Sequence, residues 1–96
     1  MRGASGRIYT GCNVENASYP VGTCAEAGAI AAMVAAGEQR LVEALVLGPR
    51  PLTPCGACRQ RLAEFAEGTT PIHAAGPEGI YATHQLGALL PEAFDL

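Results

Sequence analysis

The alternation of apolar and polar positions divides the first half of the chain into a strand, a loop and a helix. Residues 7–15 are rich in β-branched and aromatic side chains, which favours a strand. Residues 16–22 contain Asn, Ser, Pro and Gly and predict a loop. Residues 23–36 are rich in alanine, with apolar positions on nearly all sides, so they predict a largely buried helix that stops at Gly37.

The second half of the chain repeats this alternation. The apolar run at residues 41–47 predicts a buried strand, and residues 55–67 predict a second helix. Residues 71–75 and 79–82 predict two further strands, and the tail at 84–96 predicts a short helical turn. The order β-α-β-α-β-β indicates an α/β fold in which helices pack on a mixed sheet.

Composition limits what this fold can do. The 96 residues are 49% hydrophobic and 16% charged, which indicates one globular domain spanning residues 1–96 and excludes intrinsic disorder. The net charge of −3 argues against nucleic acid as a partner. The longest apolar run, at residues 29–36, is far shorter than the ~20 residues of a membrane span, so no membrane partner is expected. The N-terminus has no apolar secretory core, so we expect a cytoplasmic protein with reduced cysteines.

Three of the four cysteines fall in the first turns of the two predicted helices. Cys24 opens the first helix, and Cys55 and Cys58 open the second. The positive end of each helix favours the thiolate form of a cysteine. Three thiolates would fill three corners of a tetrahedral Zn²⁺ site and leave one corner open, an arrangement typical of catalytic zinc.

A carboxylate accompanies the first of these cysteines. Glu26 lies two residues after Cys24, where it can move protons while zinc activates water at neutral pH. The spacing Cys-x-Glu, followed by Pro-Cys-x-x-Cys at residues 54–58, is typical of zinc deaminases, in which the glutamate is not a ligand.

Two other interpretations of the cysteines remain. Cys55 and Cys58 alone also fit a thioredoxin-like redox pair. A structural zinc site would need a fourth thiol, and Cys12 is the remaining candidate. Because Cys12 lies within a predicted strand, we interpret it as a small buried core residue instead.

With these motifs in place, the sequence resembles the cytidine deaminase family, in its tetrameric branch with an all-cysteine zinc site. The resemblance rests on separated motifs in the family's order: Asn13-Val14-Glu15-Asn16, Ala17-Ser18-Tyr19, Cys24-Ala25-Glu26, Pro54-Cys55-Gly56-Ala57-Cys58, Arg59-Gln60 and Leu89-Leu90-Pro91 before Phe94. It implies a three-layer α/β/α fold and a homotetramer or dimer. The implied reaction is the hydrolysis of cytidine and 2′-deoxycytidine to uridine and 2′-deoxyuridine with release of ammonia, a step of pyrimidine salvage.

The resemblance also implies roles for individual residues. Glu26 would transfer protons to the base, and the backbone at Ala25 would contact the base carbonyl. Asn13 and Glu15, two apart on the predicted strand and so on one face, would hold the 3′-hydroxyl of the sugar. Tyr19 would lie near the site of its own or of a neighbouring subunit. A related aminated ligand of the blasticidin type is the alternative substrate.

Two positions depart from the family pattern. Many members carry an arginine directly after Cys-Ala-Glu, whereas this chain has Ala27. Arg59 is therefore expected to offset the thiolate charge around zinc with help from the helix dipoles, and Gln60 is expected to lie behind the ligands beside it. The family also has a helix and a strand before the position of Arg2, so the resemblance implies that this chain lacks them.

Overall fold

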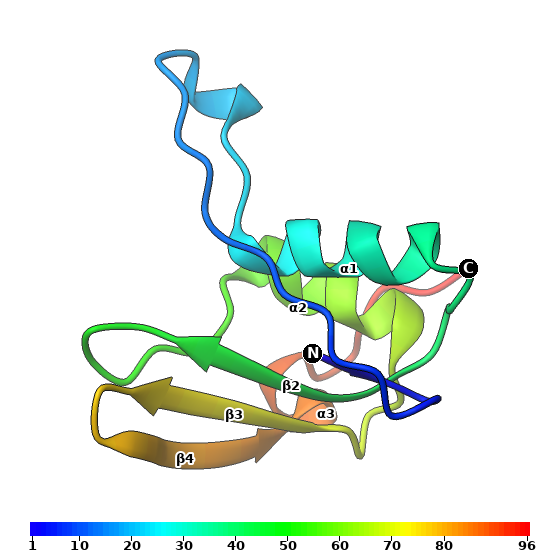
Figure 1. Cartoon of the computed structure of the whole chain (residues 1–96). Helices are drawn as coiled ribbons and strands as arrows, with labels where there is room; N and C mark the ends of the chain where they lie inside the picture. Colours follow the sequence, from blue (N-terminus) through cyan, green and yellow to red (C-terminus); the bar gives the residue numbers. More distant parts are fainter.

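The computed structural model describes all 96 residues and forms one sheet with helices packed against it (Figure 1). The predicted α/β class is confirmed, and both long helices and the strand at Leu41–Leu47 lie where the sequence pattern placed them. The elements are β1 (Arg2–Gly3), the 3₁₀ turn η1 (Tyr19–Val21), α1 (Ala25–Ala35), β2 (Leu41–Leu47), α2 (Gly56–Phe65), β3 (Pro71–Gly76), β4 (Gly79–Gln85) and α3 (Leu86–Leu89).

The sheet is mixed and has the strand order β1-β2-β3-β4. β2 and β3 are parallel and are joined through α2, whereas β1 pairs antiparallel with β2, and β4 pairs antiparallel with β3. A parallel pair requires a crossover connection, and α2 provides it. The N-terminus of α2 therefore lies beyond the carboxyl end of β2.

Helices α1 and α2 cover the same face of the sheet, and the opposite face carries no helix (Figure 1). Ala44 of β2 is buried toward the helices, so its neighbour Leu45 points to the other face, where its exposed fraction is 48%. Leu47 on that face is 71% exposed. The 96 residues thus form two layers, and the second helical layer of the expected three-layer arrangement is not among them.

The core lies between this helical layer and β2 and β3. Met33 of α1 and Leu62 of α2 are fully buried, and each such side chain contributes about 1.5–3 kcal/mol by leaving water. This packing holds the two helices against the same strands. The cluster comprises Tyr9, Ile30, Met33, Leu41, Ala44, Leu62, Ile72 and Leu86.

The strand predicted at residues 7–15 is wrong. That segment makes only two isolated bridges, and the first strand of the sheet is instead β1. The physical reason lies at Gly11, where an added Cβ would meet the carbonyl oxygen of Ala25 at 2.1 Å and the amide nitrogen of Ala29 at 2.6 Å. The segment therefore runs against α1 instead of pairing in the sheet.

Candidate metal centre

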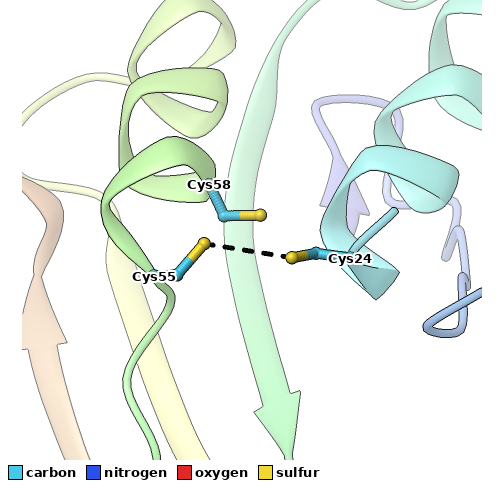
Figure 2. A group of neighbouring side chains, drawn as sticks. All are labelled: Cys24, Cys55 and Cys58. Carbon is cyan, nitrogen blue, oxygen red and sulfur yellow. Dashed lines mark hydrogen bonds between the residues drawn. The ribbon is translucent and has the colours of Figure 1, made fainter. Parts of the chain in front are cut away.

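Three thiols converge at the adjoining N-termini of α1 and α2. Cys24 is the N-cap residue of α1, and Cys55 is the N-cap residue of α2. Cys58 lies one turn into α2, so its thiol points to the same side as that of Cys55. Figure 2 shows the three side chains directed toward one another from the two helices.

The spacing of the sulfur atoms suits a tetrahedral ion. The Cys24 and Cys55 sulfurs are 3.9 Å apart, and all three ligand atoms lie within 4.8 Å of one another. A tetrahedral zinc with Zn–S distances of about 2.3 Å separates two sulfurs by about 3.8 Å. Soft thiolates also favour zinc over magnesium or calcium. Both geometry and donor chemistry therefore fit the zinc predicted from Cys24, Cys55 and Cys58.

The metal-free thiols differ in how readily they lose a proton. The backbone N–H of Cys58 donates toward the Cys55 sulfur and lowers the pKa of that thiol. Burial first, and then the negative charge of Glu26, raise the pKa of Cys58 to about 12. The pKa of Cys24 is lowered by its hydrogen bond with Cys58, but burial and Cys55 outweigh this effect and raise it overall. A divalent cation supplies the positive charge that all three thiolates need to coexist.

Glu26 lies beside this triad. It occupies the first turn of α1, and only 8% of its surface is exposed. A cavity of about 980 Å³ is lined by Glu26 together with Cys24 and Cys55. A carboxylate is seldom buried without a partner charge or a chemical role. Glu26 is therefore placed to exchange protons with a molecule in the cavity.

Comparison with known proteins decides the family. The family model described as the cytidine and deoxycytidylate deaminase zinc-binding region matches residues 2–74, which include all three thiols and Glu26. The chain belongs to this deaminase family. The zinc-binding character predicted from the sequence is thereby confirmed.

Individual deaminases are similar along most of this chain. A cytidine deaminase of Sporosarcina psychrophila is 38% identical, in a match that covers 93% of this chain and 67% of the relative. A cytidine deaminase of Mycobacterium tuberculosis (strain H37Rv) is 44% identical, covering 95% of this chain and 66% of the relative. The crystal structure of cytidine deaminase from Burkholderia pseudomallei superposes with a TM-score of 0.87 at 38% identity, covering 97% of this chain and 76% of that one. The chain thus spans about two thirds of the length of these curated relatives.

In this deaminase-family chain, Asn13 and Ala25 meet directly. The side-chain oxygen of Asn13 accepts a hydrogen bond from the backbone N–H of Ala25 at 2.9 Å. That N–H, which the resemblance assigned to the base carbonyl, is therefore already occupied in this structure. Asn13 and Ala25 both line the cavity beside the thiols.

Glu15 and Tyr19 lie outside the cavity. Both belong to residues 13–23, here called the arm, whose base is closed by the bridge between Val14 and Thr23. The arm projects away from the helices and the sheet (blue to cyan in Figure 1), and Tyr19 is 91% exposed. Cys12 is also exposed, so its interpretation as a core residue is wrong, and it is not part of the thiol cluster.

The arginine expected to contact the thiols does not do so. Arg59 donates to the carbonyl oxygens of Pro54 and Leu89 and to the hydroxyl of Thr53, so it ties the proline-rich loop to α3. Gln60 donates to the carbonyl oxygen of Phe94 and holds the C-terminal segment.

Sequence reasoning missed the arginine that does contact a thiol. Arg61 donates to the Cys58 sulfur at 3.3 Å. Its position three residues after Cys58 in a helix was the available signal, because residues at that spacing share a face.

No helix in the structure has the length and apolar composition of a membrane span.

Proposed function

We propose that this chain hydrolyses cytidine and 2′-deoxycytidine to uridine and 2′-deoxyuridine and releases ammonia, in the salvage of pyrimidines. The observation that carries the proposal is the buried Glu26 beside the converging thiols of Cys24, Cys55 and Cys58, in one cavity. A redox pair needs two thiols and no buried carboxylate, and a structural zinc site needs a fourth protein ligand. The relatives named cytidine deaminase support a cytosine nucleoside as the substrate.

In the proposed reaction, the metal and Glu26 have different roles. Cys24, Cys55 and Cys58 would hold the zinc, which would supply Lewis acidity when bound. Glu26 takes a proton from the attacking water and transfers it to N3 of the pyrimidine ring. The water oxygen becomes bonded to C4 as a hydroxyl group. Glu26 then takes the proton of this hydroxyl and delivers it to the amino group, the C4–N bond breaks, ammonia leaves, and the oxygen remains as the C4 carbonyl. Water and cytidine are thus converted into uridine and ammonia, with no oxidant or reductant.

Asn13 and Glu15 of the arm are assigned to the sugar. The oxygen of Asn13 is engaged by Ala25, so its amide NH₂ is free to donate to a ribose hydroxyl. The exposed carboxylate of Glu15 would accept from the same 3′-hydroxyl. Tyr19 belongs to the projecting arm and is 91% exposed, which supports a homotetramer or dimer in which Tyr19 contacts a neighbouring copy. Reduced thiols are required throughout, which supports action in the cytoplasm.

A substrate panel tests the proposal. The zinc-loaded chain is mixed separately with cytidine, deoxycytidine, adenosine, guanine and blasticidin S, and deamination is followed by absorbance and ammonia release. Loss of the cytidine and deoxycytidine bands, abolished by a chelator and restored by zinc, supports the proposal. Turnover of blasticidin S alone would assign a related aminated ligand. Stoichiometric zinc without turnover of any compound would assign a non-catalytic zinc module.

A further inference from the structure

One charged side chain donates a hydrogen bond to the thiol cluster. The guanidinium of Arg61 donates through Nη1 to the sulfur of Cys58 at 3.3 Å. Arg61 lies on the exposed side of α2, one turn after Cys58, so its long side chain reaches back along the helix to the sulfur. None of the other arginines donates a hydrogen bond to a sulfur in this structure.

The thiol cluster needs such a charge. Three thiolates and one Zn²⁺ sum to a charge of −1, and surplus negative charge on the ligands weakens the metal as an electron acceptor. A guanidinium cannot lose its proton in a protein, so it supplies a fixed positive charge. One arginine on one ligand sulfur brings the sum to zero.

Neighbouring residues do not supply this charge. Ala27, which follows Cys-Ala-Glu, is uncharged. Arg59 lies next to Cys58 in sequence but uses Nε, Nη1 and Nη2 on Pro54, Leu89 and Thr53. The positive ends of α1 and α2 contribute only partial charges.

We propose that Arg61 neutralises the surplus thiolate charge of the zinc site by donating to the Cys58 sulfur, and so keeps the metal an effective Lewis acid. Arg61 acts through Cys58 and not on the substrate, so it is a positioning residue. Its effect on turnover rests on the proposed function, whereas its effect on the ligand sulfur does not. Hydrogen bonds from residues behind the metal ligands are typically worth about 10–100-fold in metal affinity or activity.

The test compares four proteins: wild type, Arg61→Gln, Arg61→Lys and Arg40→Gln. Arg40 is a matched surface control, because its ion pair with Glu67 lies in solvent, where such pairs contribute little. Each protein is loaded with Co²⁺, which takes the place of zinc and has visible spectra that report the charge on the sulfurs. Each is also loaded with zinc, and the metal bound per chain is measured.

Removal of the hydrogen bond should leave Cys58 more electron-rich. In Arg61→Gln we expect the sulfur-to-cobalt band to move to longer wavelength, with one metal per chain retained. We also expect kcat for cytidine to fall about 10–100-fold. Arg61→Lys should restore much of each effect, and Arg40→Gln should match the wild type.

Two outcomes separate this inference from the proposed function. A cobalt band in Arg61→Gln at the wild-type wavelength would overturn the role of Arg61. A shifted cobalt band in Arg61→Gln, together with a wild type that never deaminates cytidine, would uphold the role of Arg61 and overturn the proposed function.

Discussion

The side-chain oxygen of Asn13 caps helix α1 by accepting the backbone N–H of Ala25 at 2.9 Å. Cys24, the N-cap residue, makes no capping bond with its own side chain. A residue twelve positions upstream of Ala25 therefore satisfies an unpaired amide at this helix end. The same contact ties the start of the arm to the turn of α1 that presents Glu26, and so links the proposed sugar contacts to the proton-transfer group.

Replacement of Asn13 tests this link. Asn13→Ala should lower the free energy of unfolding by about 0.5–2 kcal/mol, the usual cost of a lost helix cap. It should also lower kcat/KM for cytidine at least about tenfold, because the sugar donor is lost with the cap, while zinc content stays at one per chain. Urea unfolding, steady-state kinetics and metal analysis check the three quantities. Asn16→Ala is the control for stability, because Asn16 bonds only to Ser18 within the exposed arm; an equal loss in both variants would contradict a special role for Asn13.

Gly11 permits the close approach of its segment to α1. A Cβ at this position would lie 2.1 Å from the carbonyl oxygen of Ala25 and 2.6 Å from the amide nitrogen of Ala29, and both contacts are with backbone that cannot yield easily. We expect Gly11→Ala to destabilise the chain by about 1–3 kcal/mol, as overpacking usually does. Gly56→Ala is the matched control, since nothing lies within 4 Å of its added Cβ. Equal unfolding midpoints in urea for the two variants would show that Gly11 is not required there.

The four cysteines differ in their relation to the metal. Cys24→Ser, Cys55→Ser and Cys58→Ser should each lose tightly bound zinc, because each removes one of three thiolates within 4.8 Å of one another. Cys12→Ser should retain one zinc per chain, because its exposed thiol lies outside the cluster. Metal analysis after dialysis against a weak chelator distinguishes these variants. Zinc loss in Cys12→Ser would point to a closed four-thiolate site.

Glu38 makes stability depend on pH. Its carboxylate accepts hydrogen bonds from the Tyr9 hydroxyl and from the backbone N–H and hydroxyl of Ser5. The hydrogen bond from Tyr9, followed by those from Ser5, lowers the pKa of Glu38 below its ordinary value of 4.5. This contribution to stability is therefore fully present above about pH 4.5 and is lost as pH falls through the lower folded-state pKa.

Thermal unfolding across pH checks the Glu38 contribution. Glu38→Gln should have a lower Tm than the wild type near neutral pH, and the difference should shrink as pH falls below the ordinary carboxyl range. Glu67→Gln is the control, since the carboxylate of Glu67 is largely exposed and pairs only with Arg40 at the surface. A Tm difference between Glu38→Gln and wild type that stays constant down to strongly acidic pH would contradict this account.

Local sequence patterns predicted much of the fold and of the metal site. The alanine-rich run before Gly37 and the apolar run at Leu41–Leu47 each match one regular element, because periodicity and stop signals act over a few residues. Cys24, Cys55 and Cys58 were found because a metal restricts both the residue type and its place at a helix start.

The errors arose where contacts between distant residues decide the structure. Residues 7–15 have strand-like composition, but the close approach of Gly11 to α1 takes them out of the sheet and leaves Cys12 exposed. Adjacency to Cys58 in sequence favoured Arg59. In a helix, however, the residue three positions away shares the face of Cys58, whereas Arg59 points elsewhere and donates to Pro54 and Leu89. These contacts involve residues that are distant in sequence, and local sequence patterns do not specify them.

The central claim is that Glu26 transfers protons and is not a zinc ligand. The decisive measurement is zinc content and cytidine turnover in purified wild type and Glu26→Gln, side by side. The wild type should bind one zinc per chain and remove the cytidine absorbance band, and Glu26→Gln should bind the same zinc while kcat falls by at least about 100-fold. Loss of zinc from Glu26→Gln, or turnover equal to that of the wild type, would contradict the assignment.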